Sequence, residues 1–333
     1  MTPKTKYLTS IDVMISVPII CDSSIALLNP PNGFVFKTVS FEQYLFSKNM
    51  RDYNGNVLLD YVYALFDRPE KILVLEHQNT YTLELNEPIQ GGLFGLSTKE
   101  ESTIKKELAV VKESLVETLR RYFALLHIYK EGDVAYKKIF VRYAHGTNYI
   151  CPHVNHFDAI TFNQNPMIIQ PYEVQAINTF ILTHSIAFDM IKEVAVDDLV
   201  CTYHSIYNAT NYKNLFTILE ALLIDGYSKS DTLAKRLAVL TKSSNSDIDA
   251  RYTRFKQLYD IRNNAVHRGD VSQITKALVD EMRDVVREVI KAYFNHIENY
   301  ILLNPSASFS QAKVNCIKHL KRKIKSKATW PQT

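Results

Sequence analysis

The first hundred residues of the chain alternate between short apolar runs and turn-forming clusters. Residues 11–20 and 33–41 are rich in β-branched and aromatic side chains, and an Asn-Pro-Pro-Asn-Gly cluster separates them. Runs of this kind, bounded by Pro, Gly and Asn, are typical of β-strands. Residues 71–77 and 81–85 have the same character and predict a hairpin that turns at residues 78–80. We therefore expect a mainly β region.

The pattern changes to helical spacing at Thr98. Thr98 followed by Glu101 is the arrangement of a capped helix start. Apolar residues then recur at helical spacing up to about residue 127: Ile104, Leu108, Val111, Leu115, Leu119, Phe123 and Leu126. Two further alternating runs, 138–143 and 159–163, predict strands. The N-terminal domain is therefore expected to end near residue 165.

Strand signals end at Pro171, and the remaining chain carries helical spacing. The runs that predict helices are 173–194, 197–208, 212–224, 232–240, 247–267 and 272–302. Gly226 and Gly269 follow two of these runs, and we expect them to cap the helices at their C-terminal ends. The second half of the chain is therefore predicted to be a helical bundle.

Length and composition fit a two-domain α+β protein. A chain of 333 residues exceeds the size that a single core usually reaches. A hydrophobic content of 46% excludes the disordered and fibrous classes. We expect an N-terminal mainly β domain with one long helix at 1–165, a C-terminal all-α helical bundle at 171–303 and a basic tail at 304–333.

Positive charge is concentrated at the C-terminal end of the chain. Residues 305–333 hold seven of the 39 Lys and Arg residues and none of the 35 Asp and Glu residues, so the rest of the chain has a net charge of −3. A segment of this composition can bind RNA phosphates by releasing counterions, or it can be a solvated terminus. Both interpretations stay open at this point.

The cysteines and the apolar runs favour a soluble cytoplasmic protein. The four cysteines lie far apart and form no CxxC pair, which favours reduced thiols: Cys21, Cys151, Cys201 and Cys316. Asp12 and Asp22 bracket the apolar run near the start and no cleavage site follows it, so we expect no signal peptide. No run reaches the roughly 18 uncharged apolar residues of a membrane helix.

The predicted helix at 247–267 carries an arginine within its apolar stripe. At 100° per residue, Leu258, Tyr259, Arg262 and Val266 lie within about 60° of Phe255. Burial of an unpaired guanidinium is costly, so the Arg262 side chain must be paired or must lie at an interface.

Two polar residues flank this stripe near the predicted end of the helix. Asn263 and His267 are neighbours at i and i+4, and Gly269 follows directly. A purely structural interpretation pairs Arg262 with an acid of the bundle such as Glu220, and leaves His267 to cap carbonyl groups.

The motif resembles the signature of a known superfamily. Arg262-Asn263-Asn264-Ala265-Val266-His267 is an Arg, a polar residue and a His after four intervening residues. Three blocks precede or lead into it, at 214–223, 233–240 and 258–261. Together they resemble the HEPN superfamily, and within it the Apea-like subgroup. The resemblance covers roughly residues 195–300 and says nothing about residues 1–165.

The resemblance implies a metal-independent endoribonuclease without a cofactor. Arg262 and His267 match the catalytic positions, and Asn263 matches the polar residue that orients them. Histidine can take the proton of a ribose 2′-OH, and arginine can stabilise charge on the scissile phosphate. Attack by the 2′-OH leaves a 2′,3′-cyclic phosphate and a 5′-OH, and it confines cleavage to RNA.

The family also implies partners and a biological setting. HEPN modules commonly pair, so a homodimer through the bundle is the implied state, with RNA, including tRNA, as the substrate to test. The subgroup is associated with bacterial defence against phage, and we expect the N-terminal domain to sense a phage-derived trigger or restrain the nuclease. Three residues near the motif are expected to bind the substrate: Lys256, Tyr259 and Arg268. For the two cations, the alternative is that they lie on a solvated face of the helix.

Two other functions remain as alternatives. A catalytically silent HEPN module would only bind RNA or a partner protein. A metal-dependent enzyme would be centred on Cys151, His153 and His156, but no second ligand cluster accompanies them and the segment is typical of a loop leading into a strand. Tyr203, Tyr207 and Tyr212 are core residues or, alternatively, stacking platforms for bases.

Overall fold

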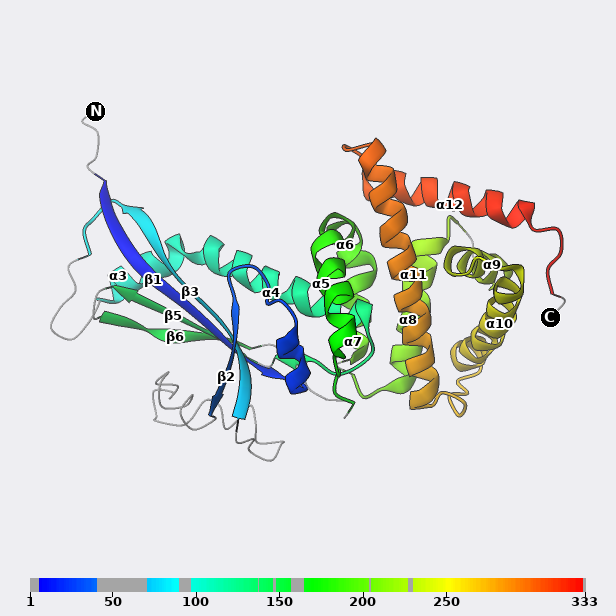
Figure 1. Cartoon of the computed structure of the whole chain (residues 1–333), viewed down its shortest axis with the longest axis horizontal. Helices are drawn as coiled ribbons and strands as arrows, with labels where there is room; N and C mark the ends of the chain where they lie inside the picture. Colours follow the sequence, from blue (N-terminus) through cyan, green and yellow to red (C-terminus); the bar gives the residue numbers. More distant parts are fainter. Residues whose placement is uncertain are drawn as a thin grey trace. The chain divides into compact units, whose positions relative to one another are not determined.

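The computed structural model has an N-terminal antiparallel sheet and a C-terminal helical region, which confirms the expected α+β class (Figure 1). The residues that it describes are 6–40, 71–89, 97–136, 138–145, 148–156, 165–203, 205–226 and 230–331. They group into two compact units. The first is formed mainly by Met1–Phe123 and Asp133–Ala159, and the second mainly by Ala124–Gly132 and Gln175–Thr333.

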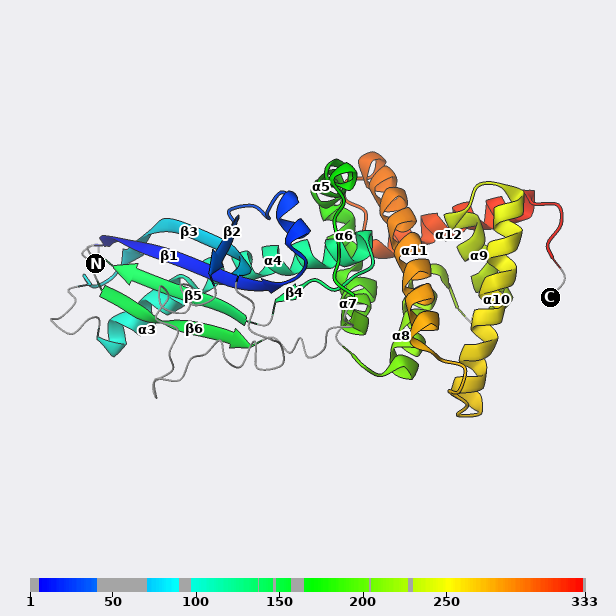
Figure 2. The ribbon, with the colours of Figure 1, turned by 60° about the horizontal axis from the view of Figure 1, so that its bottom comes forward.

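The first unit is built on an antiparallel sheet with strand β1 at its centre (Figure 2). Along the path β2-β3-β1-β5-β6 the strands are β2 (Val35–Ser40), β3 (Lys71–Leu85), β1 (Tyr7–Ile20), β5 (Lys138–His145) and β6 (Asn148–His156), and β4 (Ala135–Tyr136) also pairs with β1. Ile11, Val13 and Ile15 of β1 are fully buried, while Asp12 between them is exposed. This alternation is the period-two pattern of a strand with one covered face.

Strand β3 corrects the predicted hairpin at 71–85. The strand continues through residues 78–80, where Gln78 pairs with Met14, Asn79 with Val13 and Thr80 with Asp12. The Thr80 hydroxyl donates a hydrogen bond to the Asp12 carboxylate at 2.6 Å. Residues 78–80 are exposed, so polar side chains are tolerated there and imitate a turn.

Strand β6 corrects the loop predicted around Cys151. Asn148–His156 pairs with β5 and is the last strand on the described path of the sheet. An edge position tolerates Pro152, because a proline cannot donate to a further neighbour. The strand predicted at 159–163 lies outside the described residues.

The predicted long helix is two helices, α3 (Thr98–Glu107) and α4 (Ala109–Tyr129), with a break at Leu108. Ser97 caps α3 and forms a capping box with Glu100, one residue before the predicted start. In the first unit α4 packs through aromatic rings, with Tyr122 6.5 Å from Phe36 and Phe123 5.0 Å from Tyr136.

The second unit is a helical bundle that follows the predicted runs with two corrections. The run at 173–194 is divided into two helices at His184 and ends in a π-helical turn, and the helix predicted at 197–208 ends at Tyr203. Its helices are α5 (Val174–Thr183), α6 (Ser185–Ile191), α7 (Asp197–Tyr203), α8 (Asn208–Leu223), α9 (Ser230–Thr241), α10 (Asn245–His267), α11 (Lys276–Leu303) and α12 (Phe309–Ser326), with a π-helical turn at Lys192–Val196. Gly269 has a φ of +68° directly after the cap residue of α10, as predicted. Gly226, with a φ of +106°, lies two residues beyond the cap residue of α8, so it shapes the following turn instead.

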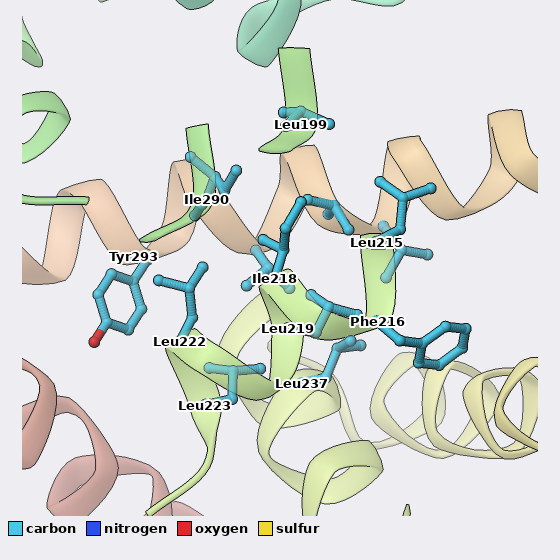
Figure 3. Close-up of a cluster of buried hydrophobic side chains, with 14 of the residues drawn as sticks. Leu199, Leu215, Phe216, Ile218, Leu219, Leu222, Leu223, Leu237, Ile290 and Tyr293 are labelled. Carbon is cyan, nitrogen blue, oxygen red and sulfur yellow. The ribbon is translucent and has the colours of Figure 1, made fainter. Parts of the chain in front are cut away.

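Helix α8 carries much of the apolar core of this unit. Its buried side chains meet residues of several neighbouring helices, including Leu199 of α7, Leu237 of α9 and Ile290 of α11 (Figure 3). Six aliphatic and phenylalanine residues of α8 have no exposed surface at all, like Tyr212 of the same helix: Leu215, Phe216, Ile218, Leu219, Leu222 and Leu223. Each such side chain contributes about 1.5–3 kcal/mol of burial free energy, so α8 is central to the stability of the bundle.

Two arginines of α11 are buried among its apolar positions. Arg283 and Arg287 are 1% and 3% exposed. The Glu131 carboxylate, just after α4, forms ion pairs with both guanidinium groups and accepts a hydrogen bond from Tyr203 at 3.0 Å. Asp280 pairs with Arg283 at 2.8 Å. Two buried guanidinium groups therefore share a carboxylate from outside the main bundle sequence, and each has a second carboxylate on α11, Asp280 for Arg283 and Asp284 for Arg287.

The structure differs from the predicted domain limits in two places. The second unit includes Ala124–Gly132, which the predicted limit at 165 assigns to the first domain. Much of the predicted basic tail at 304–333 is helix α12, whose Ala312, Cys316 and Leu320 have no exposed surface. These apolar positions recur at helical spacing between the lysines, and the lysines dominate the composition of the segment.

The described part of the chain contains no helix that is long and apolar enough to cross a membrane. The three described cysteines, Cys21, Cys201 and Cys316, are free thiols. Burial raises the pKa of the Cys21 and Cys316 thiols to about 12. These two thiols therefore stay protonated near neutral pH.

Replacing Glu131 tests the role of the buried charges. Glu131→Gln keeps the size of the side chain and removes its charge, so Arg283 and Arg287 lose their shared partner. We expect the free energy of unfolding of the second unit to fall by about 2 kcal/mol, because each buried guanidinium loses one of its two carboxylate partners and keeps the other, Asp280 for Arg283 and Asp284 for Arg287. The measurement is urea denaturation followed by the fluorescence of Trp330, which packs on Tyr252 of the same unit at 5.2 Å.

The matched control is Glu87→Gln, which removes an equivalent charge from an exposed pair with Lys99. Pairs on the surface contribute little to stability, so the control should unfold like the unaltered chain. If Glu131→Gln shifts the transition no more than the control does, the charge of Glu131 does not stabilise the bundle.

Candidate functional site

Helix α10 is held against α8 by aromatic packing. Phe216 of α8 contacts Phe255 and Tyr259 of α10, with both pairs of ring centroids 5.5 Å apart. The Tyr212 hydroxyl donates a hydrogen bond to the carbonyl oxygen of Leu258 at 2.9 Å. These contacts fix which face of α10 meets α8, and Arg262 follows on that face one turn after Leu258.

Arg262 lies at the edge of this interface and faces Glu220 of α8. Its Nη2 atom is 3.6 Å from Oε1 of Glu220, and the Tyr259 hydroxyl donates to the same oxygen at 3.4 Å. The guanidinium carbon lies 5.5 Å from the centre of the Tyr259 ring. Glu220 is therefore the acidic partner of Arg262 that the structural interpretation of the sequence names.

The contacts of Arg262 leave much of its hydrogen-bonding capacity unused. A guanidinium carries five N–H donors. Its contact with Glu220 is long, and the bond that it donates to Oδ1 of Asn263 is 3.5 Å. The Nε atom is buried and has no hydrogen-bond partner among the described residues. With a side chain that is 21% exposed, Arg262 can still donate to an incoming anion.

His267 is the last residue of α10 and is exposed. The helix ends in a well-defined turn, because the carbonyl oxygen of Asn264 accepts from the backbone N–H groups of Arg268 and Asp270. Within the described part of the chain, the His267 side chain makes no hydrogen bond or ion pair that would occupy its ring nitrogens. An exposed imidazole at a rigid helix end is accessible to a ligand.

The motif residues are only partly brought together in one chain. Arg262 and Asn263 are in contact, whereas His267 has no described contact with either. Because α10 remains helical through His267, the directions of Arg262 and His267 differ by about 140° around its axis. Val266, between them, is 43% exposed, and Val271 after the turn is 45% exposed.

The expected substrate-binding residues occupy different environments. Lys256 donates to the Ser230 hydroxyl at 3.1 Å, whereas Arg268 is exposed beside His267. Tyr259 is 7% exposed and packs on Phe216, so it positions Arg262 more than it offers a surface for a base.

The tyrosines singled out in the sequence also separate into core and surface. Tyr203 and Tyr212 are buried, at 3% and 0% exposed, and burial raises the pKa of both hydroxyls. Tyr207 is 69% exposed. Of the three, Tyr207 alone presents its ring to solvent.

The structure also contains a charged groove that sequence reasoning missed. It has a volume of about 610 Å³ and runs along α11. Its lining mixes acids and bases: Tyr129, Lys130, Glu131, Arg251, Glu281, Asp284, Val285, Arg287, Glu288 and Lys291. Many of these charges pair with one another, for example Arg251 with Glu288 at 2.6 Å. One feature of the sequence could have indicated this groove. Arg283 and Arg287 lie at i and i+4 within the apolar stripe of α11, where buried guanidinium groups need acidic partners.

The metal alternative receives no support from the described residues. They contain no group of three or more potential metal ligands. Cys151, His153 and His156 lie in β6, and their side chains are outside what the structure describes. Nearby His145 forms a contact of 3.1 Å with the carbonyl oxygen of Ser10.

Comparison with protein-family models, with curated proteins and with solved structures gives no match for this chain. Evidence for a function therefore comes from the sequence motif and from the geometry around α10. That geometry offers an arginine with unused donors and an exposed histidine five residues later, at the end of the same helix.

Proposed function

We propose that the protein is a metal-independent endoribonuclease of the HEPN type. The observation that carries the proposal is Arg262 at the edge of a packed interface with donors to spare, five residues before the exposed His267. Asn263 contacts Arg262 and orients it. Arg268 and Lys256 bind phosphates of the substrate, and Tyr259 holds the arginine in place.

The chemistry follows from these residue types. A ring nitrogen of His267 takes the proton of the ribose 2′-OH, and the 2′ oxygen attacks the adjacent phosphorus. The bond from phosphorus to the 5′ oxygen breaks, and that oxygen takes a proton from water. Arg262 donates to the phosphate oxygens as negative charge accumulates on them. The products are a 2′,3′-cyclic phosphate and a 5′-OH, and no metal takes part.

A homodimer completes the site in this proposal. Arg262 and His267 point in different directions on one helix, so the arginine of one copy meets the histidine of the other across a two-fold axis. The exposed Val266 and Val271 supply apolar surface next to His267 for such a contact.

The biological role follows from the HEPN resemblance: a cytoplasmic, toxin-like effector of antiviral defence, with RNA, including tRNA, as the target. An unrestrained ribonuclease would harm its own host, so we assign the first unit to sensing a phage-derived trigger or to inhibition.

The second candidate function is a catalytically silent HEPN module that binds RNA or a partner protein. The ion pair between Arg262 and Glu220 and the separation of His267 favour this alternative, because both fit purely structural roles. Binding without cleavage would distinguish it from the enzyme.

The direct test is cleavage of purified total RNA and tRNA in the presence of a chelator. Arg262→Ala and His267→Ala should each lower the cleavage rate at least about a hundredfold, because each removes a group that acts in the transition state. Mapping of the product ends should find 2′,3′-cyclic phosphates. Arg120→Ala and His145→Ala, which change the same residue types in the first unit, should leave the rate unchanged.

Cleavage that disappears with the chelator would point to a metal enzyme. Cleavage that survives both site substitutions would remove these residues from the reaction. RNA binding without cleavage, both by the unaltered chain and by Ile15→Ala, which weakens the first unit, would favour the silent module.

Mixing the two inactive variants tests the shared site. A mixed dimer of Arg262→Ala and His267→Ala chains has one site with both residues intact and one with neither. After subunit exchange, we expect about a quarter of the unaltered activity, because half of the dimers are mixed and each holds one working site. No recovery, with mixed dimers confirmed by mass spectrometry, would exclude a site shared in this way.

Weakening the first unit tests the regulatory part of the proposal. Ile15 is fully buried in β1, and Ile15→Ala should destabilise the sheet by about 2–5 kcal/mol. If the first unit restrains the nuclease, this variant should cleave RNA faster, and His267→Ala should abolish the gain. Val110→Ala truncates an aliphatic side chain that is 78% exposed and serves as the control. Equal cleavage rates for the unaltered chain, Ile15→Ala and Val110→Ala would contradict restraint by the first unit.

A further inference from the structure

Helix α12 presents positive charge on a fixed surface. Its N-terminal end is closed by a capping box between Ser308 and Gln311. Its apolar face is covered by the bundle, with Ala312, Cys316 and Ile317 at most 2% exposed. The polar face of α12 therefore has a defined orientation within the second unit.

Some basic residues of α12 and its cap residue Lys327 form ion pairs with the bundle, and others do not. Lys321 pairs with Asp225 at 2.7 Å, and Lys327 pairs with Asp249 at 3.0 Å. Both join α12 to the bundle. Lys318, Arg322 and Lys325 are exposed and have no ion-pair partner among the described residues. We call these three residues the cationic stripe.

The three residues of the cationic stripe lie on one face of α12. At 100° per residue they fall within about 60° of one another, and they span about 10 Å along the helix axis. His319 adds no full charge at neutral pH, because burial and the neighbouring cations Lys323 and Arg322 lower its pKa. The stripe is therefore a compact patch of three permanent charges.

We propose that the cationic stripe of α12 binds the phosphate backbone of RNA. The inference rests on the proposed ribonuclease function and names a second contact for its substrate, on a different helix from Arg262 and His267. Such a contact increases affinity for RNA by releasing counterions and does not depend on base sequence.

Two observations favour RNA over a membrane surface as the partner. A basic amphipathic helix binds a membrane by inserting its apolar face, but the apolar face of α12 is already buried in the bundle. The chain outside residues 305–333 has a net charge of −3. The excess positive charge that attracts RNA phosphates is therefore concentrated on α12. Its phosphates follow at short intervals, about 3.4 Å per strand in a duplex, and the stripe is long enough to face more than one of them.

The test measures RNA binding in the full chain that carries His267→Ala, so that cleavage does not interfere. The stripe is neutralised by Lys318→Gln, Arg322→Gln and Lys325→Gln together. The probe is a fluorescent single-stranded RNA of about 20 nucleotides, and binding is followed by anisotropy between about 50 and 200 mM salt. We expect the affinity to fall at least about tenfold at the lower salt concentration. The slope of log affinity against log salt should fall by about 2, since each lost contact on single strands contributes about 0.7.

A matched control removes the same charge from the first unit through Lys6→Gln, Lys71→Gln and Lys106→Gln, all at exposed positions. It should bind RNA like the His267→Ala parent. Both triple variants should melt at the temperature of the parent, because none of the six side chains is buried. Vesicles rich in phosphatidylserine, mixed with the parent, should not bind.

Three results would overturn the inference: unchanged affinity and salt slope in the stripe variant, an equal loss in the control, or tighter binding to the vesicles than to RNA. Failure of the ribonuclease proposal has a different signature, because the chain with an intact His267 would then leave no cyclic-phosphate ends even where the stripe binds RNA.

Discussion

The second unit depends on the burial of helix α8 by its neighbours. Residues from Leu215 to Leu223 face several helices at once, so α10 and α11 can each remain apolar on a single stripe and polar elsewhere. Arg262 lies where the stripe of α10 passes the polar edge of α8 and meets Glu220. The same packing that stabilises the bundle therefore decides how far this guanidinium is covered, and how much of it remains for a ligand.

Much of the fold could be predicted from hydrophobic spacing, and the misses have physical reasons. The helices of the bundle and the central strand β1 have strong periodicity over many residues, so their existence follows from sequence. The polar residues at 78–80 imitate a turn because only long-range pairing with β1 keeps them extended. Helix α12 is hidden by its lysines, although Ala312 and Cys316 mark a buried face.

The candidate site was predictable in its residues but not in its geometry. The position of Arg262 in an apolar stripe gave its need for a partner, and Glu220 is that partner. The helix predicted at 247–267 does extend to His267, and its geometry separates the two side chains around the axis. Spacing did not reveal how far each of the two side chains is covered by its neighbours. The pairing of Arg287 with Glu131 could not be predicted from the sequence either, because Glu131 lies 156 positions earlier in the chain.

The two units are built from alternating segments of the chain. Ala124–Gly132 supplies Leu125, Ile128 and Glu131 to the second unit, while β5 and β6, later in the sequence, belong to the first. A genetic crossover at residue 123 would take the strands β4, β5 and β6 from the sheet, and one at residue 165 would take the Glu131 carboxylate from the bundle. No single breakpoint between these positions yields two intact halves, so recombination has to pass on both units together.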